Sequence, residues 1–388
     1  MKIHESLTLS PSLEFGQTIA KLKQSGEKII SLGLGEPEFP TPENISEAAF
    51  KAIKEGYTRY SSPLGIVPLR EQIALKLQKE NGISAGLGEI MVVPGAKNAL
   101  FLALAAVLQQ GDEIINFSPC YVSNIPLIYL AEPQAVIRTC EMNKADFSID
   151  VEYFKSLISP STKAVLLNYP NNPTGTILEP DTVEEIVRIC VENNIYIISD
   201  EIYEPVYYGA LTFTSPASIE GGDDFVITIN GFSKSYSMTG WRIGYIHTKN
   251  QELFKVMLKI HQQLNTNTPV FTQYAALEGL NNNQHTLESF KSDLRQRADY
   301  AFSVLNERDK LSLVRPTGGI FGFVNISKTG LNSEAFAIKL LKAQKIAILA
   351  GKSFGEHFDD HCRVSFVCAN EEFKEGIDKI AEFANTEI

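Results

Sequence analysis

A lysine and an arginine eight residues apart are the side chains in this sequence that most strongly suggest chemistry. Lys234 and Arg242 lie in Asn230-Gly-Phe-Ser-Lys-Ser-Tyr-Ser-Met-Thr-Gly-Trp-Arg-Ile-Gly-Tyr245, a segment rich in small and hydroxyl residues. A lysine amine forms a Schiff base with an aldehyde, and an arginine is the strongest side-chain ligand for a phosphate. Pyridoxal 5′-phosphate (PLP) carries both groups and would use the two side chains together. Taken alone, the pair is also consistent with a basic surface turn.

Three other polar loops follow predicted strands, at the edge where open α/β sheets bind ligands. Pro94-Gly-Ala-Lys-Asn98 leads into a predicted helix whose first N–H groups would suit a phosphate, although many such turns are only tight connections. Asn168-Tyr-Pro-Asn-Asn-Pro-Thr-Gly175 has the prolines and glycine of a turn, but a turn does not explain its three asparagines. In Ser199-Asp-Glu-Ile-Tyr203, Asp200 would be either a helix cap or the partner of a charged pyridine nitrogen.

Alternating short apolar strands and helices would position these loops. The expected strands are 90–93, 113–117, 135–139, 164–167, 195–199, 226–229 and 242–247. Such nearly all-apolar strands predict a largely parallel sheet that is covered on both faces. We therefore expect an α/β fold with a large domain over residues 46–292 and a small α+β domain formed by residues 1–45 and 293–388. The first helix is expected over Thr18–Lys23.

Composition argues against several classes of protein. The 388 residues are 44% hydrophobic and 21% charged, which is typical of a globular chain with a large core. The net charge of −11 argues against non-specific binding to nucleic acid or to anionic membranes. The five scattered cysteines include no C-x-x-C pair, and the six histidines no H-x-x-x-H pair, so we expect reduced thiols, no metal site and a cytoplasmic protein. No stretch approaches the ~20 apolar residues of a membrane span.

Together, these motifs resemble those of the class I/II aminotransferases, which are fold-type I PLP enzymes. The sequence looks most like the bacterial and archaeal branch that resembles aspartate aminotransferases. The resemblance covers nearly the whole chain, from Gly35-Glu-Pro-Glu-Phe39 through Tyr60 and the loops above to Arg363. It implies that the chain binds PLP and transfers the amino group of an L-amino acid to a 2-oxo acid, expected to be 2-oxoglutarate, by a ping-pong mechanism. It also implies a homodimer with no nucleic-acid or membrane partner.

The resemblance assigns the catalytic and ring-binding roles to specific residues. Lys234 would form the Schiff base with PLP and then move the proton. Asp200 would keep the pyridine nitrogen protonated, so that the ring can accept electrons. Asn172 and Tyr203 would hydrogen-bond the ring oxygen O3′. Tyr121 is at the position where the family stacks an aromatic side chain on the ring.

The same resemblance implies a phosphate site and a substrate site. The implied phosphate ligands are Gly95, Ala96, Lys97, Ser233 and Arg242, together with Tyr60 of the neighbouring subunit. The α-carboxylate of the substrate would be bound by Arg363, whose planar fork fits it bidentately, and by Gly35 and Asn172.

Two positions differ from what the resemblance leads us to expect. Gly231 stands where many relatives have a phosphate-binding serine, so phosphate binding would rest more on Ser233 and Arg242. Lys97 matches the lysine that acidic-substrate relatives use for the distal carboxylate, whereas Glu14 lies near the place of a threonine in those relatives. A carboxylate at that place would repel an acidic substrate, so the sequence leaves the amino donor open among acidic, aromatic, aliphatic and basic amino acids.

Other functions fit the sequence less well. A C–S β-lyase would use the same lysine on the same fold. A nicotinamide oxidoreductase is suggested only by Gly33-Leu-Gly-Glu-Pro37, and a P-loop only by Gly351-Lys-Ser353, and both motifs are incomplete. A non-catalytic PLP-binding regulator usually has a DNA-binding module ahead of this fold, and only about thirty residues precede the first motif here.

Overall fold

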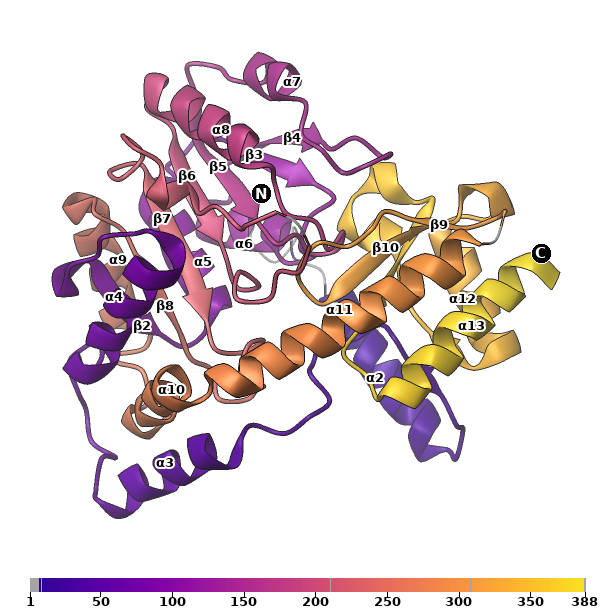
Figure 1. Ribbon diagram of the computed structural model, residues 1–388. Coiled ribbons are helices and arrows are strands. Elements are labelled where there is room, and N and C mark those ends of the chain that lie inside the picture. The colour runs from indigo at the N-terminus through magenta and orange to yellow at the C-terminus, as the bar shows by residue number, and fades with distance from the viewer. Residues whose placement is uncertain (1–6, 8, 210, 308, 387–388) are drawn as a thin grey trace.

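The computed structural model describes residues 7, 9–209, 211–307 and 309–386, which form a large and a small lobe (Figure 1). The helix α11 (Gln284–Asn306) runs from the large lobe along the small one. It buries Leu287, Phe290 and Leu294 on one face, the spacing of three to four residues that aligns side chains along a helix. No helix in this part of the chain is both long and apolar enough to cross a membrane.

A seven-stranded sheet forms the centre of the large lobe, in the order β2-β8-β7-β6-β5-β3-β4. The strands are β2 (Ile90–Val93), β3 (Glu113–Ser118), β4 (Val136–Glu141), β5 (Thr162–Asn168), β6 (Tyr196–Asp200), β7 (Val226–Gly231) and β8 (Gly244–His247). β8 is antiparallel to both of its neighbours, and the other neighbouring pairs are parallel. The expected α/β fold with a mostly parallel sheet is therefore confirmed.

Helices cover both faces of this sheet (Figure 1). One face packs against α5 (Ala96–Val107), α6 (Asn124–Ala131) and α9 (Gln251–Leu264). The other is covered by α4 (Val67–Asn81), α7 (Val151–Ser156), α8 (Pro180–Glu192) and α10 (Val270–Asn282), and α3 (Glu43–Lys54) packs against α10. Both faces are covered, which is why the inner strands β3 and β7 are buried at every position.

The small lobe has its own sheets and its own apolar core. An antiparallel sheet has the order β12-β13-β10-β9, and β1 pairs in parallel with β11. These strands are β1 (Ile30–Ser31), β9 (Ser312–Leu313), β10 (Phe321–Asn325), β11 (Ile346–Ala347), β12 (Leu349–Ala350) and β13 (His361–Ser365). The helices α12 (Ser333–Gln344) and α13 (Asn370–Thr386) pack against them.

Several expected boundaries differ from the structure by two residues or more, and two of these differences have a clear physical reason. The helix expected over Thr18–Lys23 is α2, which spans Pro11–Gln24, because Pro11 suits the first turn and Glu14 lies there at the positive end of the helix dipole. The last strand of the large sheet begins at Gly244 instead of Arg242. Arg242 has φ +53°, outside the extended region, so the chain turns there before it enters β8.

Candidate active site

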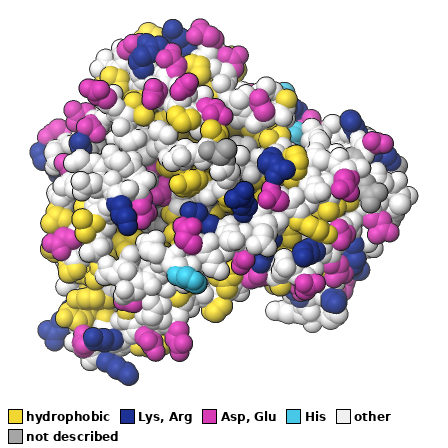
Figure 2. Space-filling model, viewed as in Figure 1, with side chains coloured by type: hydrophobic (Ala, Val, Ile, Leu, Met, Phe, Trp, Pro, Cys, Tyr) yellow, Lys and Arg dark blue, Asp and Glu magenta, His cyan; other side chains and the backbone are white. Residues whose placement is uncertain are grey.

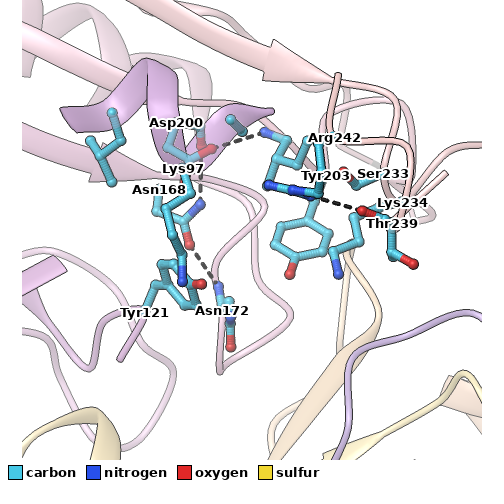
Figure 3. A pocket seen from close by; sticks show the side chains of 13 residues that line it. Lys97, Tyr121, Asn168, Asn172, Asp200, Tyr203, Ser233, Lys234, Thr239 and Arg242 are labelled. Carbon is cyan, nitrogen blue, oxygen red and sulfur yellow. Dashed lines mark hydrogen bonds between the residues drawn. The ribbon is translucent and has the colours of Figure 1, made fainter. Parts of the chain in front are cut away.

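A cavity of about 420 Å³ opens at the carboxyl end of the parallel strands, a size that suits a small ligand. It is lined by Ala96, Lys97, Leu100, Tyr121, Asn168, Asn172, Asp200, Ile202, Tyr203, Ser233, Lys234, Thr239 and Arg242. These residues come from five separate segments of the chain, and their polar groups are directed at a common space (Figure 3). The structure thus brings together most of the site residues that the sequence suggested.

Lys234 extends from the loop that follows β7, and its amine reaches this space (Figure 3). The Nζ atom donates a hydrogen bond to the carbonyl of Gly35, 2.6 Å away. Burial, together with the charge of Arg363, lowers the pKa of Lys234 to about 8. A larger share of neutral amine follows at neutral pH, and the neutral amine is the form that attacks an aldehyde.

Asp200 ends β6 and is 6% exposed. Its Oδ1 accepts a hydrogen bond from the backbone N–H of Ile202 at 3.2 Å. Burial raises the pKa of Asp200 to about 7. A carboxylate that is buried without a cation is costly, so a positively charged ring nitrogen in the cavity would stabilise its ionised form.

Arg363 and Asn172 connect the two lobes at the edge of the cavity. The guanidinium of Arg363 donates to Asn172 Oδ1 at 2.9 Å and to the carbonyl of Gly33 at 2.6 Å. It lies over the ring of Phe321 at 3.9 Å and that of Phe354 at 4.8 Å. Burial lowers the pKa of Arg363 to about 10. The fork thus contacts neutral acceptors and two ring faces, an arrangement that suits a carboxylate ligand.

The hydroxyl of Tyr203 belongs to the same group of side chains. Burial raises the pKa of Tyr203 above its ordinary value, while the charge of Arg363 and a hydrogen bond with Asn172 act in the opposite direction. Tyr203 therefore stays a neutral hydrogen-bond donor at physiological pH.

A phosphate-sized cradle lies at the start of α5. Gly95 has φ +89°, and a Cβ there would come within 2.5 Å of Arg242 Nη2, so only glycine lets the guanidinium approach the turn. The first N–H groups of α5, at Ala96 and Lys97, point out of the helix end. Arg242 is held by a hydrogen bond from its Nη1 to the carbonyl of Thr239 at 2.8 Å.

The opposite wall of the cavity carries Lys97 and Tyr121. Lys97 Nζ lies 5.6 Å from the centre of the Tyr121 ring. Among the described residues, Lys97 has no ion-pair partner. Several basic side chains gather near the middle of this face, between the lobes, although the chain as a whole is acidic (Figure 2). The positive electrostatic potential of these side chains therefore favours anionic ligands in the cavity.

Gly35, Tyr60 and Gly231, which the sequence singled out, do not line the cavity. Gly35 contacts Lys234 through its carbonyl, and it is Gly33 that contacts Arg363. Tyr60 does not line the cavity of its own chain and is 85% exposed. Gly231 has little room for a side chain, because a Cβ there would come within 3.1 Å of Ile202 Cδ1 and of a backbone oxygen.

Four lining residues were missed: Leu100, Asn168, Ile202 and Thr239. Asn168 and Ile202 lie inside the polar loops that the sequence indicated, so position in those loops was their only signal. Thr239 lies between Lys234 and Arg242, where its carbonyl contacts Arg242.

The residues present fit PLP. A buried carboxyl with a single backbone partner suits a pyridine nitrogen, and the glycine cradle with Arg242 suits a phosphate. A lysine amine of lowered pKa between them suits an aldehyde. All three features open into the same cavity.

Comparison with known proteins finds similarity to aminotransferases. A sequence model of the family "Aminotransferase class I and II" matches residues 27–380. The aspartate aminotransferase of Pyrococcus abyssi is 38% identical over 91% of this chain and 90% of its own. The aromatic-amino-acid aminotransferase 2 of Thermococcus litoralis is 36% identical over 92% of each chain. The structure of the Thermus thermophilus aspartate aminotransferase with maleate superimposes with a TM-score of 0.93 at 32% identity, over 98% of both chains.

Proposed function

The chain belongs to the class I and II aminotransferase family, and from that premise we propose that the cavity at the end of its parallel strands binds PLP and carries out transamination. An amino acid gives its amino group to the cofactor and leaves as a 2-oxo acid, and a second 2-oxo acid, 2-oxoglutarate, then takes the group up. PLP, when bound, supplies an aldehyde that bonds to an amine and a protonated ring that withdraws electrons from the substrate α-carbon.

Lys234 is the residue that we propose bonds to the cofactor and transfers the proton. Its side chain extends from the loop of residues 232–243 between β7 and β8, and its lowered pKa lets it accept a proton near neutral pH. Asp200 would hold a proton on the ring nitrogen, and the buried carboxyl is well suited to do so. Asn172 and Tyr203 would donate to the ring oxygen from the opposite side of the cavity.

Substrate orientation is assigned to Arg363. Its guanidinium is fixed by two hydrogen bonds and two aromatic rings, so a carboxylate that replaces its neutral partners would meet a fork already in place. Orientation of that carboxylate directs the α-hydrogen toward Lys234. The phosphate would be bound by Ser233, Arg242 and the N–H groups that begin α5.

For the amino donor we propose an acidic or aromatic amino acid. The relatives named above are aspartate and aromatic-amino-acid aminotransferases. Lys97 offers a cation for a distal carboxylate beside an aromatic ring, Tyr121, against which a flat side chain would pack.

A homodimer is part of the proposal, because Tyr60 would complete the phosphate site of a second copy. Tyr60 is 85% exposed, and the neighbouring segment also exposes Phe50 (64%), Ile53 (43%) and Tyr57 (41%). A run of exposed apolar side chains of this kind is typical of a surface that a partner covers. A cytoplasmic location is also proposed, supported by five cysteines that are all free thiols.

The domain boundaries also remain a proposal: residues 46–292 in one domain, and residues 1–45 with 293–388 in the other. The separate apolar cores of the two lobes support this division. Residues 1–6, 8, 308 and 387–388 of the proposed small domain, and residue 210 of the large one, lie outside the described part of the chain.

The single observation that carries the function is the convergence of Lys234, Asp200 and Arg242 on one cavity. The test is to mix the purified protein with PLP and each amino acid in turn, and to follow the loss of its visible absorbance. Formation of the 2-oxo acid is then measured with and without added 2-oxoglutarate. Sustained product formation only with the second substrate is expected, whereas product without it would indicate a β-lyase. A protein that acquires no visible absorbance with PLP would refute the proposal.

A further inference from the structure

Asn168 is a buried side chain at the centre of the site to which the mechanism above gives no role. It is the last residue of β5, lies directly opposite Asp200 in the parallel pairing of β5 with β6, and is 5% exposed. Its side chain lies between Asp200 and Asn172 (Figure 3). The position puts one amide group between the two residues that would meet opposite sides of the pyridine ring.

Both polar atoms of the Asn168 side-chain amide form a hydrogen bond, each with a different residue. The Nδ2 atom donates to the backbone carbonyl of Asp200 at 3.1 Å. The Oδ1 atom accepts from the backbone N–H of Asn172, also at 3.1 Å. A carbonyl can only accept and a backbone N–H can only donate, so these partners fix the orientation of the amide without ambiguity. Alanine would lose both bonds, and aspartate would lose the donor alone.

The two anchored residues have few other restraints on their side chains. The carboxyl of Asp200 accepts from one N–H, that of Ile202. Its direction therefore follows the backbone of Asp200, whose carbonyl is held by the Asn168 side chain and by the backbone N–H of Tyr169. The Oδ1 atom of Asn172 accepts a hydrogen bond from Arg363 at 2.9 Å. A shift of the Asn172 backbone would therefore move its hydrogen bond with the arginine proposed to bind the substrate carboxylate. Loss of the hydrogen bond from Asn168 to Asp200 would therefore shift the carboxyl that faces the ring nitrogen. Loss of the hydrogen bond from Asn172 to Asn168 would shift the contacts of Asn172 with the ring oxygen and with Arg363.

We propose that Asn168 is a positioning residue for transamination, which holds the acid for the ring nitrogen and the amide for the ring oxygen in one rigid frame. This inference rests on the proposed function, since it takes PLP as the group that lies between Asp200 and Asn172. Asn168 acts through these two neighbours and takes no proton itself. At the last paired position of β5 and β6, the Asn168 side chain adds a hydrogen bond to the backbone of β6.

The test compares Asn168→Ala and Asn168→Asp with a matched control, Asn116→Ala, in the protein loaded with PLP. Asn116 is also a buried strand asparagine with a side-chain partner, Asn124, but it does not line the cavity. Three properties are measured: the dissociation constant of PLP, the pH midpoint of the visible absorbance, and the separate values of kcat and KM. Thermal unfolding of the PLP-free proteins reports any general loss of stability.

For Asn168→Ala we expect PLP to bind about tenfold more weakly, which is the size of effect that the loss of about one neutral hydrogen bond has. The pH midpoint of the visible absorbance should rise. A weaker hydrogen bond to the ring oxygen and a weaker interaction of Asp200 with the ring nitrogen would both raise the pKa of the nitrogen that links the ring to Lys234. Asn168→Asp keeps the acceptor for Asn172, so kcat should fall while KM for the amino acid stays near that of the wild type. Asn116→Ala should lose stability and leave all three properties unchanged.

The inference is overturned if Asn168→Ala matches Asn116→Ala, with lower stability but an unchanged pH midpoint and PLP affinity. If Asn168→Ala does not fold, Asn168→Asp decides the question, and an unchanged pH midpoint together with an unchanged kcat would overturn the inference. Failure of the proposed function looks different, because then the wild-type protein itself would show no visible absorbance with PLP.

Discussion

Arg363 of the small lobe donates a hydrogen bond to Asn172 of the large lobe over 2.9 Å, joining residues 191 positions apart. The second arm of the guanidinium contacts Gly33, so three distant segments meet at one side chain. A planar fork with fixed donors can make both contacts at once, whereas an ammonium is a single point charge. The carboxylate site therefore depends on the shape of arginine as well as on its charge.

Replacing Arg363 by lysine should lower kcat/KM for the amino acid by about 100-fold, because the charge stays but the bidentate geometry is lost. The affinity for PLP should change little, since the fork contacts Asn172 and Gly33 through uncharged groups. Steady-state kinetics and PLP titration measure the two effects. Arg315→Lys, at a surface ion pair with Asp299, is the control. Equal loss of PLP affinity and of kcat/KM would contradict this role.

Lys234→Ala should abolish the visible absorbance of the PLP complex and nearly all turnover, because no other amine reaches the aldehyde from this loop. In the wild type, borohydride reduction followed by peptide mapping should find PLP attached to Lys234. Lys255→Ala, which removes an exposed lysine of α9, should behave as the wild type does. Attachment of PLP to Lys97 or to any other lysine would show that the assignment is wrong.

Much of this site could be predicted because its chemistry is local in sequence. The Lys234 loop and the Ser199–Tyr203 loop each contain their own functional residues and turn signals, and the apolar strands before them are easily recognised. Asn168 could not be assigned, because its role depends on the register that sets it opposite Asp200, and register is fixed by long-range pairing. The contact of Gly33 with Arg363 is hidden for the same reason: it joins segments 330 residues apart through a backbone carbonyl.

The N-terminal helix shows a different limit. Its apolar positions are weak before Ile19, the one residue of α2 that is buried, so periodicity indicated only the second half. The first turns are favoured by Pro11 and Glu14, which act through the backbone and the helix dipole and leave no apolar pattern.

The stability of the PLP-free protein should depend on the protonation of Asp200. Burial raises the pKa of Asp200 from 3.8 to about 7, so between these values the folded chain binds more protons than the unfolded chain. The free energy of unfolding must then fall as pH rises through this window, by at most about 1.4 kcal/mol per pH unit from this group.

Asp200→Asn removes this contribution, so the variant should gain stability relative to the wild type as pH rises from about 5 to about 7. Denaturant unfolding of the PLP-free proteins at several pH values measures the difference. Asp293→Asn, on the exposed face of α11, is the control for removal of a carboxyl outside the cavity. A stability difference for Asp200→Asn that is flat across the window would mean that the carboxyl is already ionised in the cavity.

The proposed dimer predicts complementation between two defective variants. If Tyr60 reaches the site of a second copy, a hybrid of Lys234→Ala with Tyr60→Ala has one site with both native residues. Mixing and reassembling the two variants should therefore restore wild-type PLP affinity in up to half of the hybrid sites, whereas neither variant alone shows it. Wild-type affinity that never appears in the mixture would mean that Tyr60 serves its own chain, and wild-type affinity in Tyr60→Ala alone would mean that Tyr60 has no part in PLP binding.

The amino donor should be decided by the balance of charge between Lys97 and Glu14. Lys97 lies at the cavity wall, 5.6 Å from the Tyr121 ring, so its charge faces the space that a substrate side chain would enter. Lys97→Met should lower kcat/KM for aspartate and glutamate by about tenfold or more, the size expected for one charge-assisted hydrogen bond, and leave kcat/KM for phenylalanine and tyrosine within about threefold.

Glu14, exposed in the first turn of α2, has the opposite charge. Glu14→Gln should therefore raise kcat/KM for acidic donors alone. Lys255→Met and Glu252→Gln, an exposed pair on α9, are the charge-matched controls and should change neither class. An equal fall for acidic and aromatic donors in Lys97→Met would show that this lysine supports the phosphate site and does not select the substrate.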